Sequence, residues 1–116
     1  MREMRKMTII LSIIIGMSMT WSSCGKIDVP EGTPECITKK IKKEKNNCLD
    51  KVYEYEYKGE LVYLFVPANC PDALSNLYKG NCDFICSPSG GISGTGDGQC
   101  VDFSQNAKNE KLIWSK

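Results

Sequence analysis

The stretch KVYEYEYKGELVYLFV, residues 51–66, decides the fold of this chain. Its two halves are rich in aromatic and β-branched residues, and Lys58-Gly59 between them suits a two-residue turn in which the glycine takes a positive φ. The stretch therefore predicts an antiparallel β-hairpin of residues 51–57 and 60–66. The expected cross-strand pairs are Tyr57 with Glu60, Tyr55 with Val62, Tyr53 with Leu64, Glu56 with Leu61, Glu54 with Tyr63 and Val52 with Phe65.

The two faces of this hairpin differ in polarity, because successive side chains of a strand point to opposite sides. Tyr53, Tyr55 and Tyr57 lie on the more apolar face, which we expect to pack on a helix. Glu54 and Glu56 lie on the other face, which we expect to be partly exposed to water. The three tyrosines could also form a stacking platform for a sugar, although half-buried packing with hydroxyl groups reaching water is the commoner arrangement.

A helix is predicted before the hairpin. Thr33-Pro34-Glu35 is typical of a helix start, with the threonine as N-cap, the proline at the first helical position and the glutamate at the positive end of the helix dipole. The helix is expected to span residues 34–46, with Ile37 and Ile41 as one narrow apolar stripe. The other positions of the helix carry Lys39, Lys40, Lys42, Lys43 and Lys45. These lysines could bind lipid headgroups, but a solvated helix surface is the favoured interpretation.

Shorter elements are expected after the hairpin. Residues 72–78 predict a helical turn, residues 82–86 a third strand and residues 100–103 a last short strand, whereas residues 112–114 could dock as a strand or turn. The sequence thus predicts an α+β fold, in which the N-terminal helix packs on a small antiparallel sheet made of the hairpin and one or two short strands. Residues 34–116 would form this single domain, stapled by disulfides.

The first 24 residues have the order of a bacterial lipoprotein signal. Arg2, Arg5 and Lys6 form a basic start, residues 7–20 are apolar and uncharged, and small residues lead into Cys24. The apolar stretch is shorter than the roughly 20 residues that a transmembrane helix needs, and no basic flank follows it. A cleaved signal is therefore expected rather than a membrane span.

This signal predicts where the mature chain begins and where it is held. Residues 1–23 would be removed, Cys24 would carry the lipid and residues 24–33 would form a tether to the domain. The acyl chains would hold the protein on a membrane, since each buried methylene contributes about 0.8 kcal/mol. We expect a cell-envelope location on the outer membrane, at its periplasmic or its surface face.

The other six cysteines are an even set: Cys36, Cys48, Cys70, Cys82, Cys86 and Cys100. In a small exported domain such a set predicts three disulfides, each worth about 2–4 kcal/mol. Cys82 and Cys86 would lie about 13 Å apart in a strand, and Cys36 and Cys48 about 18 Å apart in a helix, so neither pair should bond. The pairing otherwise stays open. No metal site is expected, because the chain lacks histidine and any Cys-x-x-Cys pair.

Charge and composition argue against two classes of function. The whole chain carries a net charge of +1, and loss of Arg2, Glu3, Arg5 and Lys6 with the signal leaves a net charge of −1. A nucleic-acid partner is therefore not expected. The absence of histidine removes the usual general base, and no spacing of serines, lysines or carboxylates selects a catalytic group. We expect neither an enzyme nor a bound cofactor.

Residues 87–99, SPSGGISGTGDGQ, form a glycine-rich segment between two cysteines. The segment lacks the Gly-Lys-Ser/Thr ending of a phosphate-binding loop. Oxygen atoms of Ser93, Thr95, Asp97 and Asp102 could bind calcium, but their spacing is not that of an EF-hand and two carboxylates are few. The composition favours a loop of tight turns, and contact with a partner is the next alternative.

Three segments resemble one family when taken together: Pro34-Glu35-Cys36-Ile37, Tyr57-x-Gly59-x-x-Val62-Tyr63, and Gly90-Gly91-x-x-Gly94-x-Gly96-Asp97-Gly98-x-Cys100-x-Asp102-Phe103. The chain resembles an uncharacterised family of small cysteine-containing lipoproteins from Gram-negative bacteria, described as a domain of unknown function. The resemblance extends roughly from Pro34 to Trp114. It implies export and these domain boundaries, and it implies no substrate.

The expected function is that of a lipid-anchored envelope lipoprotein, which acts as a binding or structural module. Its partners would be the membrane, through lipidated Cys24, and an unidentified protein or glycan. The candidate contact residues are Tyr53, Tyr55, Tyr57, Gly94, Gly96 and Asp97. The alternative is an inhibitor of secreted proteases or other hydrolases, because a helix laid over a hairpin resembles inhibitors of the cystatin type in fold.

Overall fold

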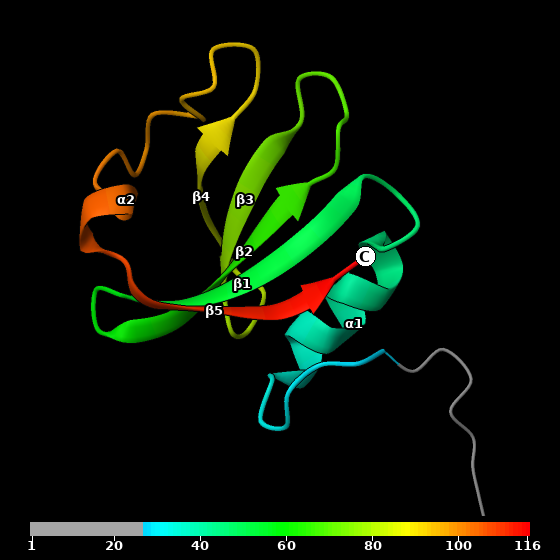
Figure 1. The fold of residues 1–116 in the computed structure, drawn as a ribbon. Coiled ribbons are helices and arrows are strands. Elements are labelled where there is room, and N and C mark those ends of the chain that lie inside the picture. The colour runs from blue at the N-terminus through cyan, green and yellow to red at the C-terminus, as the bar shows by residue number, and fades with distance from the viewer. Residues whose placement is uncertain (1–26) are drawn as a thin grey trace, which may run out of the picture.

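The computed structural model describes residues 27–116 (Figure 1). The elements follow in the order α1 (Glu35–Glu44), β1 (Leu49–Tyr57), β2 (Glu60–Pro67), β3 (Leu74–Lys79), β4 (Phe84–Gly90), α2 (Phe103–Asn106) and β5 (Lys108–Ser115). The five strands form one antiparallel sheet in the order β4-β3-β2-β1-β5. The predicted small antiparallel sheet is confirmed, and it has more strands than expected. The predicted signal, residues 1–23, and Cys24 lie outside the described residues.

The β1–β2 hairpin has the predicted register. Tyr57 pairs with Glu60, Tyr55 with Val62 and Val52 with Phe65, and the remaining three predicted pairs are also present. Lys58 and Gly59 both take positive φ, 54° and 83°. A turn with both central residues at positive φ matches the twist of the flanking strands, so the two-residue loop fixes the register.

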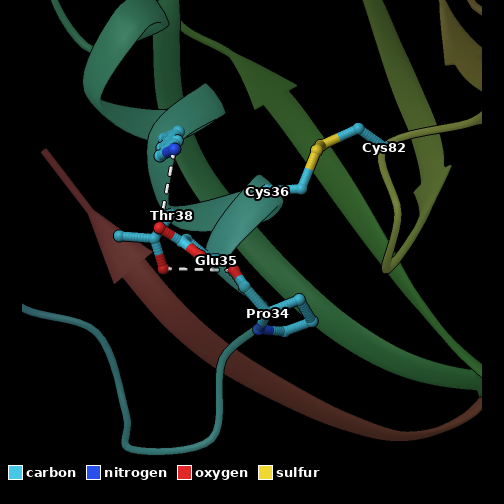
Figure 2. Close-up of polar contacts among 6 residues, drawn as sticks. Pro34, Glu35, Cys36, Thr38 and Cys82 are labelled. Carbon is cyan, nitrogen blue, oxygen red and sulfur yellow. Dashed lines mark hydrogen bonds and ion pairs between the residues drawn. A yellow bond between two sulfur atoms is a disulfide. The ribbon is translucent and has the colours of Figure 1, made fainter.

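Helix α1 begins at Glu35, one residue later than predicted (Figure 2), and it ends two residues earlier than predicted, at Glu44. Pro34 has ψ 140° and is therefore extended, so it stands at the N-cap position, and Thr33 is not the cap. The Thr33 hydroxyl instead donates to the Pro30 carbonyl at 2.7 Å. Inside the first turn, the Thr38 hydroxyl donates to the Pro34 carbonyl at 3.3 Å.

The helix packs on the face of the hairpin opposite to the predicted one. Ile37 and Ile41 of α1 are fully buried in a cluster with Val52, Tyr63 and Phe65, which we call the helix-side core. Glu54 and Glu56 on this face are half-buried and Leu61 is 53% exposed, so the face is partly exposed to water near the β1–β2 turn, as predicted. Tyr63 pairs directly with Glu54, and its hydroxyl donates to the Glu54 Oε2 at 3.1 Å. The aromatic ring can then be buried while the carboxylate stays solvated at the edge.

The tyrosine face is covered by the connection between β4 and β5. Phe103 of α2 is buried in a second cluster with Tyr57, Val62, Leu64 and Leu77. Both faces of the sheet are therefore covered, one by α1 and the other by the segment that contains α2, and Figure 1 shows the two helices at different ends of the sheet.

Two predicted elements after the hairpin were wrong. Residues 74–79 form strand β3, not a helical turn, because alternate side chains at Ser75 and Leu77 are buried and Leu77 pairs with Leu64 of β2. Residues 100–103 contain a turn and the start of α2, not a strand. The predicted third strand is shifted, since Cys82 lies in a turn with φ 74° and β4 begins only at Phe84.

Three disulfides staple the domain, as predicted: Cys36–Cys82, Cys48–Cys70 and Cys86–Cys100. Their Cα–Cα distances are 6.0, 6.3 and 6.2 Å. The first disulfide joins α1 to the β3–β4 turn (Figure 2). The third closes the connection that covers the tyrosine face. Neither pairing that helix or strand geometry excluded is present.

The described residues before α1 are packed, although residues 24–33 were predicted to be a tether. Ile27 and Val29 are partly buried against the helix-side core. The folded part of the chain therefore includes residues before Pro34. None of the helices within residues 27–116 is long and apolar enough to cross a membrane.

Candidate functional site

A hollow of about 450 Å³ opens between α2, β5 and the tyrosine face of the sheet. We call it the aromatic groove and define it by lining residues from β1, β2, α2 and β5: Tyr55, Leu64, Phe103, Ser104, Ala107, Lys108 and Glu110. Its floor is apolar and its rim is polar. This combination suits a ligand with one apolar surface and a few polar groups at its edge.

Tyr55 is the side chain that joins the floor of the groove to its rim. Its ring packs edge-on against Phe103, with 5.0 Å between centroids, and its hydroxyl donates to the Glu110 Oε1 at 2.9 Å. Burial, and then the bond to the Glu110 carboxylate, raise the pKa of the Tyr55 phenol well above its ordinary value. The phenol is thus neutral at physiological pH and remains a hydrogen-bond donor.

The three alternating tyrosines of β1 do not form one platform. Tyr57 is 3% exposed, and its hydroxyl donates to the Asp102 Oδ1 at 2.8 Å. That bond, with one from the Asn106 amide at 2.9 Å, lowers the pKa of the Asp102 carboxyl. Tyr53 lies tilted beside Tyr55, with 6.2 Å between ring centroids. Of the three, Tyr55 alone lines the groove.

The other predicted contact residues, Gly94, Gly96 and Asp97, lie in the glycine-rich loop and do not line the groove, although Pro88 and Ser89 of the same segment do. Asp97 organises this loop, because its carboxylate accepts bonds from the backbone N–H groups of Ser87 and Gln99, both at 2.9 Å. Gly96 lies against the strand that precedes it: a Cβ there would come within 2.7 Å of the Pro88 carbonyl carbon and of the Ser89 nitrogen. Gly94 is exposed and has nothing around its Cβ position. Asp97 and Gly96 thus act within the loop.

The loop presents one apolar side chain to solvent. Ile92 is 89% exposed, and the hydroxyls of Ser93 and Thr95 are bonded to each other at 2.7 Å behind it. The Cys86–Cys100 disulfide closes the base of the loop. A loop whose base is closed by a disulfide therefore carries an exposed isoleucine.

The oxygen atoms considered for calcium serve separate hydrogen bonds. Asp97 bonds within the glycine-rich loop, and Asp102 bonds to Tyr57 and Asn106. Residues 27–116 hold no group of three or more His, Cys, Asp or Glu side chains that could bind a metal ion. Nothing in this part of the chain brings the four predicted oxygen donors to one point.

Phe103 and Glu110 belong to the groove, and the sequence did not indicate them. Phe103 was assigned to a short strand, although it opens α2. Glu110 meets Tyr55 only because β5 returns to pair with β1. The one local signal was the Leu112-Ile113-Trp114 ending, which did predict that the tail could dock on the sheet.

The fold is that of a small disulfide-stapled α+β domain, with a groove between α2, β5 and the tyrosine face of its sheet. A family model for a domain of unknown function, DUF6970, matches residues 38–116. The chain belongs to this uncharacterised family, as the resemblance of its motifs to such a family implied. Neither a curated protein nor a solved structure matches the chain.

Proposed function

We propose that this protein is a lipid-anchored binding module of the cell envelope, and that the aromatic groove is its binding site. The observation that carries the proposal is the groove itself. Its volume of about 450 Å³ lies within the range of about 300–1,000 Å³ that is usual for sites of small ligands. The basic n-region, the apolar stretch and Cys24 support the anchor.

The lining indicates what kind of ligand the groove would take. Phe103 and Leu64 offer apolar contact, and the neutral Tyr55 hydroxyl lies at the edge beside Glu110. Lys108 and Glu110 place both signs of charge at the rim, so a strongly charged ligand gains little. A sugar ring or an aromatic side chain of a protein partner has the matching apolar face and polar edge.

The groove is tested by filling it. Ser104 is exposed and lines the groove, so Ser104→Trp should block the site with little effect on the core. Ser93→Trp, on the exposed glycine-rich loop, is the matched control. We expect wild type and Ser93→Trp to retain the same glycans on an array or the same protein from solubilised envelope, and Ser104→Trp to lose them. Equal retention by all three proteins would overturn the groove as the site.

The anchor is tested separately by Cys24→Ala. The variant should lose incorporation of labelled fatty acid and move from the membrane fraction to the soluble fraction, while its thermal unfolding stays that of the folded domain. A variant that remained in the membrane fraction would contradict lipid anchoring at Cys24.

The alternative function, inhibition of a secreted hydrolase, is favoured by one observation. The glycine-rich loop is closed by the Cys86–Cys100 disulfide and exposes Ile92, which is the form a substrate-like loop would need. A screen of secreted proteases should then find an enzyme that wild type inhibits and Ile92→Arg does not. Leu61→Arg, at another exposed apolar residue, should inhibit like wild type. Absence of any inhibited protease would remove this alternative.

A further inference from the structure

The start of the described chain lies against the end of it. Ile27, Trp114 and Lys116 line a hollow of about 360 Å³ together with Lys45 and Asn46, which follow α1. The backbone N–H of Lys116 donates to the Asp50 carbonyl at 2.8 Å, which holds the tail in place. Figure 1 shows the C-terminus beside α1. The chain therefore enters the fold at a defined place on the surface.

Cys24 cannot be far from this place. Two residues lie between it and Ile27, and each of the three steps from Cα to Cα adds at most about 3.6 Å in an extended chain, so the Cys24 Cα lies within about 11 Å of the Ile27 Cα. Ile27 itself is partly buried against the helix-side core. If Cys24 carries a lipid, the surface around Ile27 must stay close to the headgroups, because no long tether separates the two.

The charges of α1 are divided between two sides. Lys42 precedes Lys45 by three residues, so both lie on one side of the helix. Lys45 lines the hollow beside Trp114. Lys40 points elsewhere: its Nζ lies 4.2 Å from the ring centroid of Tyr78 and 3.0 Å from the Glu44 Oε2.

The acidic side chains near this surface in sequence are Asp28, Glu31, Glu44 and Asp50, and the Glu44 Oε2 is already paired with the Lys40 Nζ at 3.0 Å. Asp28 is exposed beside Ile27, and the Asp50 Oδ2 lies 3.9 Å from the Lys51 Nζ. The three lysines of this surface, Lys42, Lys45 and Lys116, are thus set against four carboxylates, two of which already have another lysine next to them. The surface keeps a positive balance, although the mature chain as a whole is expected to be slightly negative.

We propose that this surface, formed by Ile27, Lys42, Lys45, Trp114 and Lys116, rests on the anionic headgroups of the bilayer that holds the Cys24 lipid. The inference depends on the proposed lipidation and adds an orientation to it. Tryptophan is enriched at the membrane–water interface, and lysines near an anionic surface are attracted to it. Because α1 and α2 cover opposite faces of the sheet, the aromatic groove then opens away from the membrane.

Trp114 makes the orientation measurable. The chain contains two tryptophans, Trp21 and Trp114, so in a Trp21→Phe background all tryptophan emission comes from Trp114 whether or not the signal is cleaved. The lipidated protein is reconstituted into vesicles of phosphatidylethanolamine and phosphatidylglycerol that contain a lipid with bromine atoms near the headgroup. We expect the brominated lipid to quench Trp114 emission, relative to the same vesicles without bromine.

Charge-reversal variants test the role of the lysines. Lys42→Glu with Lys45→Glu should lose most of the quenching, whereas Lys58→Glu with Lys79→Glu changes the net charge equally at another hollow, beside the β1–β2 turn, and should keep it. Circular dichroism and thermal unfolding of each variant establish that it is folded. Equal quenching in the two double variants would overturn the proposed contact of Lys42 and Lys45 with headgroups.

The outcomes separate this inference from the proposed function. Protein that floats with the vesicles while Trp114 is not quenched would overturn the orientation and leave the lipid anchor intact. Wild-type protein that fails to float with the vesicles would overturn both. Quenching of Trp114 with loss in the Lys42 and Lys45 variant alone supports both.

Discussion

Tyr57 and Asp102 join β1 to the start of α2 through one buried hydroxyl. The Tyr57 ring packs on Phe103, with 5.2 Å between centroids, and the Tyr57 hydroxyl donates to the Asp102 Oδ1 at 2.8 Å. This one hydrogen bond has two opposite effects: together with burial it raises the pKa of the phenol, and it lowers the pKa of the carboxyl. The segment that covers the tyrosine face is thus held by a contact that depends on the charge of Asp102.

Tyr57→Phe should raise the pKa of the Asp102 carboxyl toward its ordinary value of 3.8, because the strongest hydrogen bond to the charged form is lost. In wild type, the stability that this lowered pKa contributes is fully present above the unfolded-state pKa and is lost as the pH falls through the folded-state pKa. The variant should therefore lose less stability on acidification below about pH 4. NMR titration of the Asp102 carboxyl carbon measures the shift.

Tyr55→Phe is the control for this experiment, because the Tyr55 hydroxyl donates to Glu110 and not to Asp102. The pKa of Asp102 should be the same in Tyr55→Phe as in wild type. An unchanged pKa in Tyr57→Phe would show that the bond does not set the charge state of Asp102.

Gly96→Ala should lower the free energy of unfolding by more than about 2 kcal/mol, because its φ of 75° disfavours a side chain and its Cβ would meet the backbone of Pro88 and Ser89. Gly94→Ala has a similar φ of 80° but open space around the Cβ position, so it should cost about 1–2 kcal/mol. Chemical denaturation of both variants measures the difference. Equal losses would mean that the loop moves away from β4 without cost.

The hairpin could be predicted from the sequence because every signal for it is local. The turn residues Lys58-Gly59 and the period of two in 51–57 and 60–66 fix the same register. The choice of covering element for each face could not be predicted, because it depends on where residues far along the chain return. Glu54 looked like a marker of an exposed face, yet its bond to Tyr63 lets that face pack against α1.

The second half of the sheet was harder to predict for a similar reason. Residues 74–79 contain Asn76 and Ser75, which are weak strand formers. They become a strand because β2 offers an unpaired edge and Leu77 can be fully buried opposite Leu64. In the groove, Tyr55 was a predicted contact residue, whereas Phe103 reaches it through the segment that follows the Cys86–Cys100 disulfide and Glu110 through the return of β5.

Helix α1 should contribute to stability mainly through its two buried isoleucines. Ile41→Ala should lower the free energy of unfolding by about 2–5 kcal/mol, because a fully buried side chain leaves a cavity against Val52 and Phe65. Ile92→Ala, at an isoleucine that is 89% exposed, should stay within about 0.5 kcal/mol of wild type. Thermal or chemical unfolding gives both values, and a similar loss in the two variants would contradict the packing of α1.

The whole domain is held by disulfides that connect different layers. Cys36–Cys82 links α1 to the turn between β3 and β4, and Cys48–Cys70 links the residue before β1 to the segment after β2. Cys86–Cys100 links β4 to the segment before α2, which covers the tyrosine face. A domain of this size buries a limited fraction of its surface. The disulfides add stability chiefly by restricting the unfolded chain.

The mature protein should be six hydrogens lighter without reduction than after reduction, because three disulfides form. Peptide mapping under non-reducing conditions should link Cys36 to Cys82, Cys48 to Cys70 and Cys86 to Cys100. The same protein after full reduction and alkylation is the control, in which no linked peptides remain. A link between Cys48 and either Cys36 or Cys82 would contradict the fold.

The position of strand β5 in the chain determines when the sheet can be completed during folding. It is last in the chain, yet it pairs with β1, the first strand. As the chain is synthesised from its N-terminus, strands β1 to β4 can therefore pair with one another while one edge of β1 still lacks a partner. The final residues, including buried Ile113, act as a latch that seals this edge and completes the helix-side core. A chain shortened by these few residues would retain most of its sequence and expose an edge on which other chains could pair.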